Sequence, residues 1–179
     1  MNEKTLLRKQ LITKLNHLSD HDRNILSTKI DQHITQWLDN QIFSLIGGFV
    51  PQKKEPNIWK TLTTVKDSLA LPVFNSKKKH YDWGPYSTHL HQSKFNIPEP
   101  EKAYPYPPKL DICLVPAIGI SSSGHRIGWG HGYFDRLLST NIPIRIGVIF
   151  NCQKIAKFTP DKWDIPLTHL LTESGIHKF

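Results

Sequence analysis

Apolar positions recur with helical spacing in the first forty residues of the chain. Residues 3–18 place five leucines on one helical stripe, with basic residues off that stripe. These leucines are Leu6, Leu7, Leu11, Leu15 and Leu18. The Ser19-x-x-Asp22 pattern is a capping signal for a second helix, whose inner face would carry Ile30, Ile34 and Trp37. The sequence therefore predicts two successive amphipathic helices.

The pattern then alternates between strand and helix. Residues 42–50, IFSLIGGFV, form a short apolar run bounded by Asn40 and Pro51, which is typical of a buried strand. A helix over residues 56–68 and a strand over residues 69–74 are predicted next. Residues 75–108 hold six prolines and six aromatic residues, so we expect mostly loop there, of a length that is usually functional.

The second half predicts a parallel pair of strands. The near-continuous apolar run at 110–120, LDICLVPAIGI, is typical of a central strand that is covered on both faces. A Ser- and Gly-rich loop over 121–132, a helix beginning at Tyr133 and a strand over 142–150 follow it. Right-handed crossover makes such strands parallel, which predicts an open, mostly parallel α/β sheet. Ligands in these sheets bind beyond the carboxyl ends of the strands.

Composition and charge narrow the class of protein. The 179 residues have a formal charge of +8, with 13 Lys and Arg against 8 Asp and Glu in residues 1–90, and 10 against 7 in residues 91–179. Because this excess is spread out, we expect no nucleic-acid partner, although a basic nucleic-acid-binding domain stays an alternative. Phosphate and carboxylate ligands also suit a positive protein. Neither a membrane span nor a signal peptide is predicted, and two isolated cysteines predict no disulfide framework. A cytoplasmic protein is expected.

The segment IGWGHGYFDR, residues 127–136, carries the clearest chemical signal. Three glycines at alternate positions allow backbone N–H groups to approach a ligand, and the helix that follows favours an anion at its start. This pattern predicts a phosphate cradle, although a turn that only reverses the chain would use the same residues. It matches neither the P-loop nor the dinucleotide motif. Asp135 could reach a magnesium ion on the phosphates or simply stabilise the helix dipole.

These residues resemble the signature region of the 5-formyltetrahydrofolate cyclo-ligase family. The family follows a DLVLVPG-type strand with RLGRGxGYYDR, to which residues 111–138 are similar. Further matches extend along nearly the whole chain in the same order. They are the helical pair Lys4 and Arg8, Pro51 with Glu55, the IPEP segment at 97–100, Asp164, and Thr172 with Glu173.

The resemblance implies one three-layer α/β/α domain over residues 1–179. It further implies an ATP- and Mg²⁺-dependent enzyme that cyclises 5-formyltetrahydrofolate to 5,10-methenyltetrahydrofolate, with release of ADP and phosphate. Its partners would be these two small molecules, the folate in some cases polyglutamylated, and no membrane. The basic run Lys77–Lys79 would meet a polyglutamate tail, although a solvated loop also explains it. A monomer is expected.

The resemblance also implies roles for individual residues. ATP would be bound by Lys4 and Arg8 from the first helix and by the glycine-rich loop. The loop residues are Arg126, Ile127, Gly128, Trp129, Gly130, His131, Gly132, Tyr133 and Phe134. Arg126 and Tyr133 would be catalytic. Read without the resemblance, Lys4 and Arg8 also fit a solvated helix face.

The folate and the metal would use other segments. Val50 and Glu55 match family positions that contact the folate, and a carboxylate accepts hydrogen bonds from pterin N–H groups. Trp83, with Tyr81, would wall a flat ring, although core packing explains both equally well. Asp135 and Asp164 would hold magnesium as hard oxygen ligands.

Three loop positions depart from the family pattern. Trp129 replaces the second arginine of RLGRG, Phe134 replaces a tyrosine, and His131 stands where the family has Gly or Lys. An indole lacks the charged, forked donor of arginine. The substitutions leave open an altered relative that binds nucleotide or folate without this catalysis. The pair His89 and His91 lacks further ligands at zinc-like spacing, so no zinc site is predicted.

Overall fold

The computed structural model describes residues 2–130, 132–138 and 141–179. Its helices are α1 (Glu3–His17), α2 (Asp20–Leu38), α3 (Trp59–Thr64) and α4 (Tyr133–Leu137), with 3₁₀ turns at Lys66–Ser68 and Asn151–Gln153. Its strands are β1 (Ile46–Gly47), β2 (Leu69–Asn75), β3 (His80–Pro85), β4 (His91–Gln92), β5 (Pro98–Glu99), β6 (Ile112–Pro116), β7 (Gly119–Ser121), β8 (Arg126–Ile127), β9 (Ile144–Val148), β10 (Lys154–Ile155), β11 (His169–Thr172) and β12 (Gly175–Lys178).

The two N-terminal helices are confirmed, and side-chain caps begin both. The Asn2 side chain accepts a hydrogen bond from the Lys4 backbone N–H at 2.8 Å. The predicted cap Ser19 accepts one from the Asp22 backbone N–H at 3.0 Å, immediately before α2. These bonds satisfy N–H groups that have no partner within the helix.

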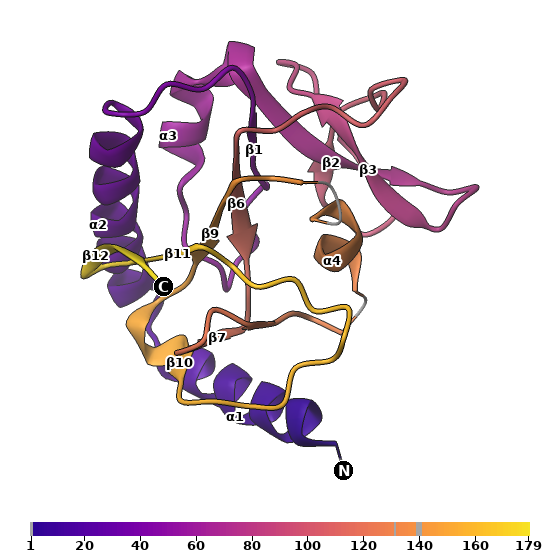
Figure 1. The fold of residues 1–179 in the computed structure, drawn as a ribbon. Helices are drawn as coiled ribbons and strands as arrows, with labels where there is room; N and C mark the ends of the chain where they lie inside the picture. The colour runs from indigo at the N-terminus through magenta and orange to yellow at the C-terminus, as the bar shows by residue number, and fades with distance from the viewer. Residues whose placement is uncertain (1, 131, 139–140) are drawn as a thin grey trace.

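A seven-stranded sheet in the order β12-β11-β9-β6-β1-β2-β3 forms the centre of the molecule (Figure 1). The five inner strands pair in parallel, including β6 with β9, and only the edge strands β3 and β12 are antiparallel to their neighbours. The open, mostly parallel sheet is therefore confirmed.

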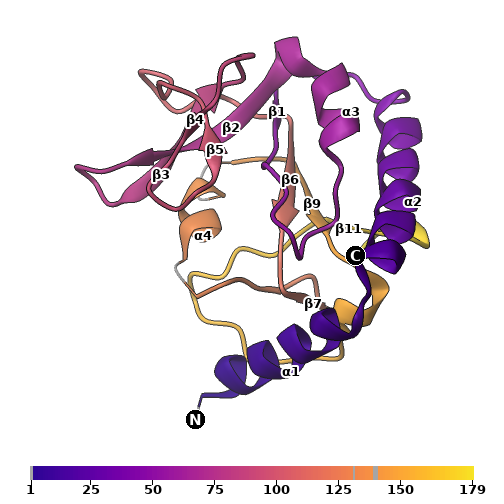
Figure 2. The same cartoon turned by 180° about the vertical axis from the view of Figure 1, so that it is seen from behind.

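Alternating residues of the sheet build two hydrophobic layers. From β6, Ile112 and Leu114 pack into the cluster that includes α2 and α3, whereas Cys113 and Val115 pack into the cluster that includes Leu137 of α4. Figures 1 and 2 show α2 and α3 on one side of the sheet and α4 on the other, as expected for an α/β/α arrangement. Within the described residues, the helices are too short or too polar to span a membrane.

The expectation of mostly loop over residues 75–108 is wrong in part. β3 pairs with β2 along six residue pairs, and β4 and β5 form a small ribbon of their own. The inward residues Tyr81 and Trp83 bury their rings, which stabilises the hairpin. Its turn contains Lys79 at φ 54°, a left-handed conformation that lysine rarely adopts.

Three other predicted elements are shorter in the structure. The strand expected over 42–50 pairs only at Ile46–Gly47. The helix expected over 56–68 divides into α3 and a 3₁₀ turn. The apolar run 110–120 forms two strands in different sheets, because β6 ends at Pro116 and β7 joins β8 and β10. Proline lacks the N–H that would continue the hydrogen-bond ladder.

Candidate functional site

A cavity lies just beyond the carboxyl ends of β1 and β6, where open α/β sheets bind ligands. Phe49 and Val50 follow β1 and Pro116 ends β6 in its wall. The other lining residues come from four further segments. They are Gln52, Glu55, Pro72, Tyr81, Ile97, Pro98, Arg126, Gly128, Trp129, Gly132, Tyr133, Phe134, Asp135 and Leu137. Most of the predicted folate and loop residues thus meet in one place.

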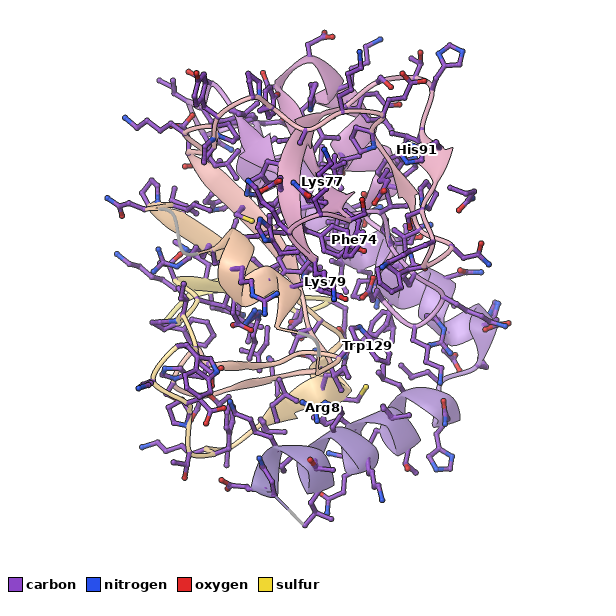
Figure 3. The ribbon with its side chains drawn as sticks, turned by 90° about the vertical axis from the view of Figure 1, so that its right-hand side faces the viewer. Arg8, Phe74, Lys77, Lys79, His91 and Trp129 are labelled. Atoms are coloured by element: carbon purple, nitrogen blue, oxygen red, sulfur yellow. The ribbon has the colours of Figure 1, made fainter. Side chains whose placement is uncertain are left out.

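The glycine-rich loop connects β8 to α4 at one side of this cavity. Gly130 and Gly132 have φ values of 104° and 65°, which side-chain-bearing residues rarely adopt. Arg8 from α1 donates its Nε–H to the Gly128 carbonyl at 2.9 Å. Figure 3 shows Arg8 beneath Trp129, and α1 thereby contacts the loop. His131 lies outside the described residues, and Ile127 is buried with Leu11 in the core.

Arg126 and Asp135 form an ion pair in the wall of the cavity. Both Nη atoms of Arg126 donate to Asp135 Oδ1 at 2.6 Å, and the Arg126 residue is only 5% exposed. Burial lowers the pKa of Arg126, whereas Asp135 and Asp164 oppose that shift. Among the described residues the Arg126 Nε–H has no hydrogen-bond partner. A cation with an unused donor therefore lies beside the cavity.

Lys4 joins α1 to the segment before β11. Its Nζ lies 2.6 Å from Asp161 Oδ2 and also forms an ion pair with Asp164. Although burial acts against the charged amine, the two carboxylates raise the pKa of Lys4. No sequence pattern singles out Asp161. Its pairing with Lys4 becomes visible only in the folded structure, where it lies beside α1.

Glu55 is a buried carboxylate that faces the cavity. It is 7% exposed, and its Oε2 accepts from the Gln52 backbone N–H at 2.9 Å. Its Oε1 accepts from Trp129 Nε1–H at 3.2 Å. Burial raises the pKa of Glu55, although these hydrogen bonds oppose the shift. Nearby, burial raises the pKa of Tyr81 to about 12, so its phenol is neutral at pH 7.

Trp83 is the one predicted folate residue that the structure keeps out of the cavity lining. It is 4% exposed and packs in the core, with its ring 6.5 Å from that of Phe134. Its packing leaves no room at Gly47, where an added Cβ would lie 2.8 Å from the indole. The segment 97–100, a family match to which the sequence assigned no role, contributes Ile97 and Pro98 to the cavity lining.

The two predicted metal ligands, Asp135 and Asp164, both interact electrostatically with Arg126. Asp135 pairs with Arg126 through Oδ1, and Asp164 accepts from Lys4 through Oδ2. In the part of the chain that the structure describes, no three His, Cys, Asp or Glu residues are grouped to hold a metal. Such a group is unnecessary for Mg²⁺ that arrives on a nucleotide, since protein then supplies one or two carboxylates and phosphates supply the rest.

An open α/β sheet whose cavity joins a glycine-rich loop, a buried cation and a buried carboxylate defines an enzyme that handles small anionic substrates. The model of the 5-formyltetrahydrofolate cyclo-ligase family matches residues 1–173. The chain belongs to this family.

Similar proteins agree with this assignment. A 5-formyltetrahydrofolate cyclo-ligase of Haemophilus influenzae is 25% identical over 93% of this chain and 98% of its own length. One from Mycoplasma genitalium is 27% identical over 93% of this chain and 96% of its own length. The solution structure of Aquifex aeolicus 5,10-methenyltetrahydrofolate synthetase has a TM-score of 0.83 and 26% identity, and the match covers 98% of this chain and 92% of that one.

Proposed function

We propose that this protein, acting as one domain of residues 1–179, uses ATP to cyclise 5-formyltetrahydrofolate to 5,10-methenyltetrahydrofolate. The observation that carries the proposal is the cavity, which joins the residues expected for both substrates in a member of the cyclo-ligase family. The formyl oxygen attacks the γ-phosphorus of ATP, and ADP leaves. N10 then adds to the activated formyl carbon, and loss of phosphate gives the methenyl ring.

ATP would lie along the glycine-rich loop and α1. Arg8 supplies positive charge from α1 beside the loop, and the amine of Lys4 lies between Asp161 and Asp164. The loop residues that line the cavity are Arg126, Gly128, Trp129, Gly132, Tyr133 and Phe134. Phosphoryl transfer depends mainly on positioning and on stabilisation of charge. Arg126 suits this role because its guanidinium is buried beside the cavity, and Tyr133 lines the same wall. We assign these two residues to the reacting phosphoryl group.

The nucleotide would arrive as its magnesium complex. Asp135 and Asp164 each use one carboxylate oxygen in an ion pair described above, which leaves the second oxygen for a hard cation. Magnesium neutralises phosphate charge. In this arrangement Arg126 holds Asp135 in place, and Lys4 holds Asp164 in place.

The folate would enter the apolar part of the cavity. Val50 and Tyr81 offer apolar surface, and Glu55 is the buried acceptor for pterin N–H groups. Trp83 would act indirectly, by supporting the ring of Phe134 from the core. The same cavity therefore offers a flat apolar wall and one charged acceptor, which are the features that a pterin requires.

Absorbance tests the proposed reaction directly. Purified protein mixed with 5-formyltetrahydrofolate, Mg²⁺ and ATP is expected to produce the longer-wavelength band of the methenyl product, and omission of any one component abolishes it. Binding of both substrates without that band would instead indicate the altered relative that Trp129 and Phe134 leave open. Absence of binding to either substrate would refute the proposal.

A polyglutamate tail would extend toward the β2–β3 hairpin, whose tip carries Lys77, Lys78 and Lys79. All three lysines are exposed, and their charge complements γ-linked carboxylates. Replacing all three with alanine is expected to raise the KM of a pentaglutamyl substrate severalfold and leave that of the monoglutamate unchanged. Alanines at the exposed Lys29, Lys60 and Lys66 are the matched control. An unchanged preference in the hairpin variant would remove this part of the proposal.

The remaining expectations concern the oligomeric state, the cellular location and the partners of the protein. We propose a monomer in the cytoplasm, where ATP is present and where Cys113 and Cys152 stay reduced. Small molecules rather than nucleic acids are its partners. Size-exclusion chromatography with light scattering measures the oligomeric state, and a dimer would contradict the proposed monomer.

A further inference from the structure

Trp129 makes a hydrogen bond with the carboxylate that is assigned to the pterin. Its indole N–H donates to Glu55 Oε1 at 3.2 Å, across 74 positions of sequence. The second oxygen of Glu55 accepts from the Gln52 backbone. These two bonds use two of the roughly four acceptor positions of the carboxylate, and the Trp129 bond is the one made by a side chain that lines the same cavity. A pterin N–H group that approaches Glu55 through this cavity therefore meets the indole.

The indole is the donor that can leave. The Gln52 N–H belongs to the same short turn as Glu55, whose own N–H donates to the Gln52 carbonyl at 2.8 Å. Trp129, by contrast, is 45% exposed and lies between two glycines, with Gly130 in a left-handed conformation. An exposed side chain on a glycine-flanked segment is free to move away at low cost.

An indole N–H is also a close chemical substitute for a pterin N–H. Each presents an N–H donor at the edge of a flat ring: the indole has one, and the pyrimidine ring of the pterin has a ring N–H beside an amino group. Both fit an apolar wall with a carboxylate behind it. The cavity wall around Glu55 includes Val50, Phe49 and Trp129 itself. The ring of Trp129 therefore occupies the edge of the place that the folate ring would take.

We infer that Trp129 competes with 5-formyltetrahydrofolate for Glu55 and so sets the folate affinity of this protein. The inference rests on the proposed function. Trp129 is a specificity-determining residue that leaves Glu55 when the folate binds, and it has no part in the phosphoryl transfer. Without the indole N–H, the free protein loses its hydrogen bond from Trp129 to Glu55. The folate complex is unaffected, because that bond is already broken in it, and the folate therefore binds more tightly.

The test is Trp129→Phe, which keeps a ring and removes the donor. Isothermal titration calorimetry is expected to show a Kd for 5-formyltetrahydrofolate about tenfold lower than in the wild type, as the loss of a hydrogen bond to a charged group implies. Trp163→Phe is the matched control, because Trp163 is 61% exposed and outside the cavity lining.

A second measurement uses the wild-type protein and needs no gain in affinity. The indole ¹H–¹⁵N signal of Trp129, assigned from its absence in Trp129→Phe or Trp129→Leu, is expected to shift when 5-formyltetrahydrofolate is added. The signal of Trp163, which is outside the cavity lining, is expected to stay in place. Folate binding with an unchanged Kd in Trp129→Phe, or with an unmoved indole signal, would overturn the inference alone. Failure of the wild type to bind the folate would overturn the proposed function together with it.

Discussion

Replacing Arg126 with methionine is expected to lower kcat by about 10²–10³-fold, the usual effect of removing a preorganised charged donor from a reacting oxyanion. Methionine keeps much of the buried volume and removes the guanidinium whose Nη atoms hold Asp135 at 2.6 Å. Stopped-flow or steady-state absorbance of the methenyl product measures the loss. The Kd of the folate is expected to change little, because Glu55 is untouched.

The same variant should also be less stable, and a double variant separates the two effects. Removing one partner of a largely buried ion pair leaves the other unpaired, at a cost of about 2–4 kcal/mol in the free energy of unfolding. Arg126→Met with Asp135→Asn removes the orphaned charge and is expected to recover much of that stability. Activity is expected to stay low, because the variant lacks both the guanidinium and a carboxylate assigned to magnesium. If activity recovered with stability, Arg126 would have only a structural role.

Replacing Glu55 with glutamine is expected to raise the Kd of 5-formyltetrahydrofolate by about 10–100-fold, because a neutral amide replaces a charged acceptor. The Kd of ATP should change much less, since Glu55 bonds to Gln52 and Trp129, and of these two residues only Trp129 is assigned to ATP. The shape of the side chain and its bond from the Gln52 N–H are retained, so the fold is preserved. Glu101→Gln is the matched control on an exposed carboxylate. Equal losses for both substrates would contradict the assignment.

The pH dependence of folate binding follows from the same residue. Burial raises the pKa of Glu55 above its usual 4.5. As the pH falls through this raised pKa, the carboxylate gains a proton and loses acceptor strength, so folate affinity should fall at a higher pH than an ordinary glutamate would give. In Glu55→Gln this component of the profile should be absent.

Local patterns were sufficient to predict the helices whose buried face and capping residue are both set by nearby positions in the sequence. Leu11 and Leu15 define the buried stripe of α1, and Ser19 caps α2 as its spacing predicts. The hairpin β2–β3 was missed because its turn uses Lys79 at positive φ where glycine or asparagine would have been a signal. Pro116 inside an apolar run was the available sign that β6 ends early.

The site was predictable as a set of positions and unpredictable as a set of contacts. Family motifs locate Lys4, Arg126 and Asp135 in sequence, but no pattern in the chain reveals that Lys4 bonds to Asp161 or that Trp129 bonds to Glu55. Such pairs join segments 74 or more positions apart, and only tertiary packing sets them. For Trp83 the sequence left ring binding and core packing open, since the two look alike in sequence, and the structure places its ring in the core.

The pair Arg126 and Asp135 has a further consequence for how this loop tolerates change. The ion pair fastens two points nine positions apart, just before and just after the glycine-rich turn. Closing a segment at both ends restricts the conformations that the segment can adopt in the folded protein. Substitutions between the fastened points therefore alter what the turn touches without moving its ends. Trp129 lies within this span, so a substitution there changes the side chain that faces Glu55 while Arg126 and Asp135 keep the two ends of the turn together.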